Sequence, residues 1–143
     1  MTKRADITAA ARSWIGTPYH HQASVKGVGC DCLGLLRGVW REVMGAEPEK
    51  APPYSPSWDE VNPQEHMLRV SHKYLRPREL TCRVEGTVLV FRMRDGAVAK
   101  HCGIVVPGNR MVHAQEGHGT VEVTLGPHWD RRVAGAFSFP GVR

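Results

Sequence analysis

The sequence predicts an α+β fold, with N-terminal helices packed on an antiparallel sheet. Apolar residues recur at helical spacing in the first half of the chain. Short β-branched runs separated by turn residues fill the part after residue 84. The chain of 143 residues is long enough to bury a core, and we expect residues 1–143 to form a single domain.

Two helices are predicted in the first 45 residues. The first is expected over residues 6–15, because an alanine-rich run with an apolar stripe follows Asp6, a residue type that caps helix N-termini. The second begins at Asp31 or Cys32 and ends at Gly45, which suits the position after a helix C-terminus. The apolar residues of this second helix share one face. They are Leu35, Leu36, Val39, Trp40 and Val43.

Residues 17–29 and 46–62 are predicted to be irregular connections. The first contains two glycines near its end, and the second contains four prolines. A third, more polar helix is expected at about residues 63–75, entered through Pro63 and ended before Pro77.

Five strands are expected in the second half of the chain, within a five- to six-stranded antiparallel sheet. Turns rich in Gly, Pro, Asn and Asp separate them, as is typical of hairpin connections. The expected strands are Thr87–Arg92, His101–Val106, Arg110–Ala114, Thr120–Leu125 and Val133–Phe139.

Composition narrows the classes of function. The formal net charge of +5 suits polyanionic partners, but the arginines are scattered, which argues against nucleic acid. No apolar stretch reaches the roughly 18 residues of a membrane span. Asp6, Arg12 and Trp14 interrupt any signal-peptide apolar region, so we expect synthesis in the cytoplasm without a signal peptide.

The four cysteines do not predict a disulfide framework or a metal site. A signal-free domain of this size differs from small disulfide scaffolds, and no C-x-x-C pair is present. The cysteines are Cys30, Cys32, Cys82 and Cys102. One alternative left open is a zinc site built from His20, His21, Cys30 and Cys32.

Cys32 is the candidate nucleophile. If Asp31 caps the second helix, Cys32 occupies its first turn, where free N–H groups and the helix dipole stabilise a thiolate. The same N–H groups can bind an oxyanion, and Gly34 leaves room for a substrate backbone. The alternative is that Cys32 is a small buried apolar residue. Cys30 precedes the helix and is expected to pack in the interior.

Two histidines fall on neighbouring predicted strands. If residues 107–109 form a three-residue hairpin loop, Val106 pairs with Arg110. In this register His101 and His113 project from one face of the sheet within reach of each other. His101 then suits a general base, with His113 holding its second ring nitrogen. The alternative is that both are ordinary strand histidines. The other face is filled by Cys102, Ile104 and Val106.

Three blocks resemble the NlpC-type cell-wall peptidases, a branch of the papain-like cysteine peptidases. Gly16–Tyr19 is similar to the family's G-x-P-Y loop, and Asp31–Leu35 to its D-C-S-G-L nucleophile block. His101–Val105 and Met111–Ala114 are similar to its H-x-G-I strand and the strand that follows. The order and spacing of the blocks agree with the family over about residues 5–139.

The resemblance implies a catalytic triad of Cys32, His101 and His113 that works without metal or organic cofactor. The implied substrates are peptidoglycan stem peptides, commonly cut at the γ-D-glutamyl–diamino acid amide. The same triad could serve an amidase, an N-acetylmuramoyl amidase or a transacylase, so these remain alternatives.

The resemblance also implies an oxyanion- and substrate-binding set around the nucleophile, formed by Tyr19, Asp31, Leu33 and Gly34. Tyr19 is expected beside the thiolate. Leu33 departs from the family pattern, in which a serine follows the nucleophile and helps to hold the polar end of the peptide. Leucine forms no such hydrogen bond, which favours the alternative of an inactive structural module of the same fold.

The run from Gly16 to Ala23, together with Gly29–Gly34, resembles the phage-type subgroup more closely. Such proteins are encoded among the tail genes of phages and gene transfer agents. This implies tail or baseplate proteins as partners, and action in the periplasm or cell wall from a virion or tail.

Overall fold

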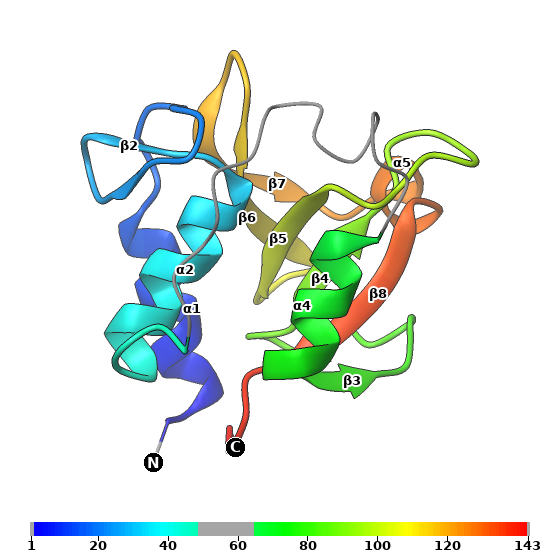
Figure 1. Cartoon of the computed structure of the whole chain (residues 1–143), viewed down its shortest axis with the longest axis horizontal. Coiled ribbons are helices and arrows are strands. Elements are labelled where there is room, and N and C mark those ends of the chain that lie inside the picture. Colours follow the sequence, from blue (N-terminus) through cyan, green and yellow to red (C-terminus); the bar gives the residue numbers. More distant parts are fainter. Residues whose placement is uncertain (1, 49–64, 143) are drawn as a thin grey trace.

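The structure is a computed structural model that describes residues 2–48 and 65–142. Helices α1 (Arg4–Ser13), α2 (Cys32–Val43) and α4 (His66–Tyr74) pack on a six-stranded antiparallel sheet, which confirms the predicted α+β class (Figure 1). The chain also forms the short helix α5 (Pro127–Asp130). The strands, in spatial order, are β3 (Arg76–Arg78), β8 (Val133–Ser138), β4 (Val88–Phe91), β5 (His101–Val106), β6 (Arg110–Gln115) and β7 (Gly119–Thr124).

The first helix begins two residues earlier than predicted. Lys3 is its N-cap, and Asp6 lies one turn inside, where its carboxylate accepts a 2.9 Å hydrogen bond from the Lys3 N–H. Asp6 therefore satisfies the open helix end from the third helical position, and its prediction as the N-cap was wrong. The helix ends at Ser13 because Gly16, with φ of 92°, turns the chain.

The second helix agrees with the prediction at both ends. Asp31 is the N-cap, Cys32 is the first helical residue, and Gly45 follows the C-cap with φ of 99°. Gly38 allows close packing of α1 on α2, because a Cβ there would lie 2.0 Å from the Trp14 ring. The two helices thereby carry one continuous apolar face to the sheet.

Two short segments differ from the predicted connections. Within the expected loop 17–29, β1 (Ser24–Val25) and β2 (Gly29–Cys30) pair as a small antiparallel ribbon. α4 is described from His66 and ends before Pro77 as expected, whereas its predicted start at 63 and most of connector 46–62 lie outside the described residues. The chain then forms β3, a strand that periodicity did not predict.

The hairpin between β5 and β6 has the predicted register. Val106 pairs with Arg110, and Ile104 pairs with Val112. Continuing this register places Gly103 opposite His113, and a Cβ on Gly103 would lie 3.3 Å from the His113 Cβ. The hairpin therefore brings His101 and His113 to one face of the sheet.

The core has two parts, one on each face of the sheet. The part beneath α1 and α2 includes Ile7, Leu35, Val39, Cys102, Ile104 and Val106. The part on the other face includes Leu89, Phe91, Val105, Met111 and Leu125, with Trp129 packed at its edge. Strict alternation along β5 divides its side chains between the two parts, as the sequence predicted. Among the described helices, none has the length and hydropathy of a membrane span.

Candidate active site

Cys32 stands at the N-terminus of α2, where the helix begins against the start of β5. Its thiol lies 3.7 Å from the backbone carbonyl of Lys100, the residue that precedes β5. Asp31 holds this helix end in place, because its carboxylate accepts a 2.7 Å hydrogen bond from the Gly34 N–H. The Asp31 carbonyl accepts a second bond from the Leu35 N–H at 2.9 Å. The amides of Cys32 and Leu33 remain as the first-turn donors for an oxyanion.

The surroundings of Cys32 favour its thiolate. Hydrogen bonding by the Cys102 thiol is the largest cause, and with hydrogen bonding and charge from His101 it lowers the pKa of Cys32 to about 5 despite burial. Burial and the neighbouring Cys32 raise the pKa of Cys102 well above its ordinary value. Near pH 7 Cys102 therefore keeps its own proton, whereas Cys32 carries the thiolate.

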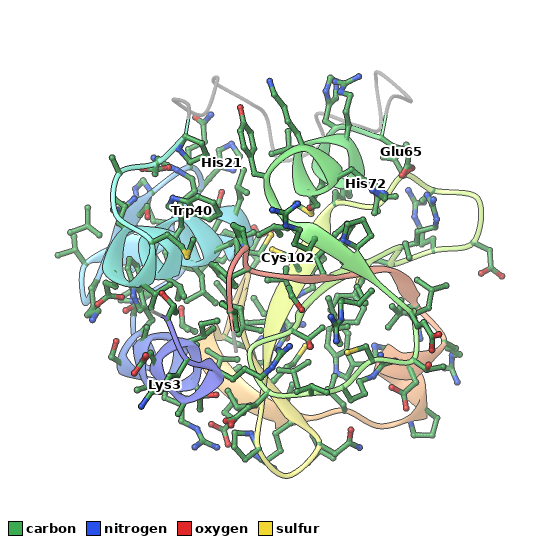
Figure 2. The ribbon with its side chains drawn as sticks, turned by 90° about the horizontal axis from the view of Figure 1, so that it is seen from below. Lys3, His21, Trp40, Glu65, His72 and Cys102 are labelled. Atoms are coloured by element: carbon green, nitrogen blue, oxygen red, sulfur yellow. The ribbon has the colours of Figure 1, made fainter. Side chains whose placement is uncertain are left out.

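Cys102 is the neighbour that the sequence analysis assigned only to packing. It lies in the interior beneath α2 (Figure 2), and its Sγ is 3.4 Å from the Cys32 carbonyl oxygen. Its position follows from strand alternation: His101 faces one side of β5, so Cys102 faces the other side and α2. The alternation of side chains along β5 was therefore a sequence signal that could have identified Cys102 as a neighbour of Cys32.

His101 and His113 form a hydrogen-bonded pair. Nε2 of His101 lies 2.8 Å from Nδ1 of His113, whose side chain is fully buried. Burial, together with His101, lowers the pKa of His113 to about 3, so this ring is neutral near pH 7, and its Nδ1 accepts the bond in the tautomer that carries the proton on Nε2. Because Nε2 of His101 is engaged in this bond, its Nδ1 is the nitrogen available to Cys32.

Tyr19 is held beside Cys32 by backbone contacts. Tyr19 forms an isolated parallel β-bridge with Cys30, and the Pro18 carbonyl accepts a 3.0 Å hydrogen bond from the Cys30 N–H. Burial and the charges of Cys32 and Asp31 raise the pKa of Tyr19 to about 12. The phenol therefore keeps its proton and can donate a hydrogen bond near Cys32.

Two residues predicted to bind substrate have clear roles in the local structure. Both Asp31 oxygens are engaged, since Oδ2 accepts a 2.8 Å bond from the Gln22 N–H, and Asp31 is buried. The space beside Gly34 is occupied by the Ala23 carbonyl oxygen, 1.8 Å from where a Cβ would lie. The expectation that Gly34 leaves room for a substrate backbone was therefore wrong, because loop 20–25 fills that room. Leu33 lies next to the nucleophile and is half-buried.

Trp129 of α5 was not identified from the sequence. Its indole lies 5.7 Å from the His101 ring at an interplanar angle of 27° and 5.1 Å from the His113 ring at 77°. No local pattern places it there, since it follows a turn signal and reaches the histidines only through the path of the chain between β7 and β8.

The described side chains around Cys32 do not form a recognisable metal site. Within residues 2–48 and 65–142, no group of three or more His, Cys, Asp or Glu side chains is arranged to hold a metal ion. His21, a member of the alternative zinc set, instead lies with Nδ1 3.8 Å from the Asp31 carboxylate.

The matched region of the chain includes every residue of this site. The sequence model of the NlpC/P60 family matches residues 16–138. The chain belongs to the NlpC/P60 family. A search of curated proteins found no significant relative of this NlpC/P60 domain.

Solved structures share the fold of this NlpC/P60 domain. The NlpC/p60 domain of the peptidoglycan hydrolase SagA has a TM-score of 0.64 at 22% identity, covering 96% of this chain and 100% of that one. A Bacillus cereus NlpC/P60 family protein has a TM-score of 0.68 at 18% identity, covering 95% of this chain and 40% of that one. A lipoprotein-like NLP/P60 family protein from Staphylococcus aureus has a TM-score of 0.61 at 18% identity, covering 95% and 41%. The chain thus spans about two fifths of the last two proteins.

Proposed function

We propose that this NlpC/P60 domain is a cysteine peptidase that hydrolyses amide bonds in the stem peptides of peptidoglycan. The observation that carries the proposal is the joint placement of Cys32 and His101. Cys32 occupies a helix N-terminus with a lowered pKa, and His101 is held by a 2.8 Å bond to His113. The printed description of SagA as a peptidoglycan hydrolase supports the choice of substrate.

The proposed first half of the reaction forms an acyl-enzyme. The Cys32 thiolate attacks the carbonyl carbon of the amide, and the oxyanion accepts hydrogen bonds from the Cys32 and Leu33 amides. Tyr19 offers a third donor, because its raised pKa keeps the phenol protonated. His101, charged after taking the thiol proton, donates that proton to the leaving amine through Nδ1.

The second half regenerates the free enzyme. Neutral His101 removes a proton from water, which attacks the thioester carbon. The carbon–sulfur bond breaks, the carboxylic acid leaves, and the proton restores the Cys32–His101 pair. His113 stays neutral throughout, since its lowered pKa prevents it from competing for the proton.

We place the cut at the γ-D-glutamyl–diamino acid amide, on the strength of the sequence resemblance. Recognition of a free amine by the nucleophile block would differ from that of relatives with serine, because Leu33 offers no hydrogen bond and the Asp31 oxygens are engaged. In this chain an apolar contact between Leu33 and the bound peptide replaces the hydrogen bond that serine makes in those relatives.

The site of action is part of the same proposal. The phage-type resemblance suggests synthesis in the cytoplasm, association with tail or baseplate proteins, and action in the periplasm or wall. None of the reported structural neighbours is described as a tail protein, so this rests on the sequence alone.

The direct test is digestion of purified peptidoglycan with analysis of the released fragments by mass spectrometry. The proposal expects new amine and carboxyl ends at the stem-peptide amide, lost in Cys32→Ala and His101→Ala and retained in Cys82→Ala. Fragments cut between muramic acid and the peptide would instead show an amidase. If no fragment is released and Cys32 is not selectively labelled, the proposal is wrong. The remaining hypothesis is then the inactive structural module that Leu33 favours.

A further inference from the structure

The short helix α5 places an aromatic ring against the two histidines of the site. Figure 1 shows α5 at the same end of the sheet as the N-terminus of α2. Among the described residues, the Trp129 indole contacts four rings: its neighbour His128 at 5.0 Å, and, from the sheet, His101 at 5.7 Å, His113 at 5.1 Å and Phe91 at 5.1 Å between centroids. With His101 the planes are within 27° of parallel, and with His113 they are near perpendicular at 77°.

The position of Trp129 is fixed by its own helix. The Gly126 carbonyl accepts bonds from the Trp129 and Asp130 N–H groups, at 3.1 and 3.0 Å. Asp130 accepts a 3.1 Å ion-pair bond from Arg83, and the His128 carbonyl accepts a 2.6 Å bond from Arg132. The ion pair with Arg83 ties α5 to a segment distant in sequence, and the Arg132 bond holds the chain just after the helix, so the contact of Trp129 with His101 does not depend on a free loop.

The general base needs such support because of where it lies. His101 opens strand β5 and is partly exposed, whereas His113 lies inside the sheet and is fully buried. A single hydrogen bond leaves the His101 ring free to rotate about the line of that bond. Water can also compete for the hydrogen bond to His113. Rings on its flank, Trp129 and Phe91, restrict the rotation and cover the bond.

The electrostatics of the contact act in the same direction. The proposed reaction passes through a positively charged His101 beside the Cys32 thiolate. The face of an indole attracts a cation within about 6 Å of the ring centre. Trp129 lies within that range and stacks on the ring that carries the charge.

We propose that Trp129 is a positioning residue of the reaction, which holds the His101 imidazole toward Cys32 and shields the His101–His113 hydrogen bond from water. The inference rests on the proposed function for its effect on turnover. Its effect on the hydrogen bond does not depend on any substrate. The indole touches no reacting atom and acts through His101.

The test compares Trp129→Leu and Trp129→Phe with the control Trp40→Phe. Trp40 lies on α2 (labelled in Figure 2), and its ring contacts Phe139. Proton NMR of 15N-labelled protein should show the His101 Nε2–H as an exchange-protected signal in wild type and control. In Trp129→Leu the signal should broaden or exchange with water. Trp129→Phe should retain it, because a ring remains on His101.

Kinetics on stem peptide provide the second readout. Trp129→Leu should lower kcat about tenfold with KM within about twofold, and Trp129→Phe should recover most of kcat. If Trp129→Leu does not fold, the flexible apolar variant Trp129→Met makes the same comparison.

The two proposals fail in different ways. A folded Trp129→Leu with a protected His101 signal and kcat equal to that of Trp40→Phe would overturn the positioning role. Loss of the His101 signal in a protein whose wild type cuts no stem peptide would support the positioning role and contradict the proposed function.

Discussion

Nε2 of His101 lies 2.8 Å from Nδ1 of His113, in a hydrogen bond to a ring that solvent does not reach. The proposed mechanism sets the direction of this bond, because a base that uses Nδ1 carries its own proton on Nε2 and donates it to His113. His113 cannot take a second proton at neutral pH because burial and His101 lower its pKa to about 3. The bond therefore fixes the tautomer of His101 and directs its other nitrogen to Cys32.

The buried His113 should make the protein acid-sensitive. In the unfolded chain this ring binds a proton near pH 6.5, and in the folded chain only near pH 3, so acid favours unfolding between these values. Between pH 7 and 4 we expect about 3 kcal/mol of stability to be lost through this residue. Urea unfolding of wild type and His113→Asn at both pH values checks this. An equal loss in the two proteins would contradict it.

Cys102 should control the acidity of the nucleophile. Removing its thiol in Cys102→Ala takes away the largest cause of the lowered Cys32 pKa, so the midpoint of Cys32 alkylation should rise. Cys102→Ser keeps a hydroxyl donor and should shift the midpoint less. The measurement is the rate of iodoacetamide labelling against pH in the three proteins. Identical midpoints would show that Cys102 only packs.

Tyr19 should act on turnover and not on the thiolate. Tyr19→Phe removes one hydroxyl donor, and loss of one oxyanion donor costs about 100-fold in kcat. The alkylation rate of Cys32 at neutral pH should change little, because the phenol is neutral in the free enzyme. Parallel peptide-cleavage and alkylation assays separate the two effects. Unchanged kcat would remove Tyr19 from the mechanism.

Gly34 should be intolerant of any side chain. A Cβ there would lie 1.8 Å from the Ala23 carbonyl, which must move together with the start of α2. We expect Gly34→Ala to cost at least about 2 kcal/mol of stability. Gly126→Ala, where nothing lies within 4 Å of the added carbon, is the control and should cost at most about 1 kcal/mol. Equal thermal unfolding curves for the two variants would contradict the clash.

Much of the fold could be predicted because the signals were local. Apolar spacing defined α2, the Asp31 cap and Gly45 defined its ends, and alternation with a three-residue loop gave the register of β5 and β6. The Asp6 cap was misplaced because a carboxylate at the third helical position satisfies the same amide. Strand β3 was missed because Arg76–Arg78 lacks an apolar pattern and forms only by pairing with β8.

Only the parts of the site that depend on side-chain alternation in a strand or on position in a helix could be predicted from local patterns. Strand parity paired His101 with His113, helix position placed Cys32 in the first turn of α2, and the resemblance to NlpC-type peptidases joined the three. These signals could not show that Ala23 fills the space beside Gly34, or that the return of the chain places Trp129 on His101. Neither contact lies within one helix or one strand, so the periodicity of a single element does not predict it.

The measurement that tests the central claim most directly is the pH dependence of iodoacetamide labelling, with the modified cysteine identified by mass spectrometry. It compares wild type, His101→Ala and the control Cys82→Ala. We predict selective labelling of Cys32 in wild type and control, with a midpoint near 5, and a midpoint shifted toward the ordinary value of 9.0 in His101→Ala. Slow labelling of all four cysteines, unchanged by His101→Ala, would contradict an activated nucleophile at this site.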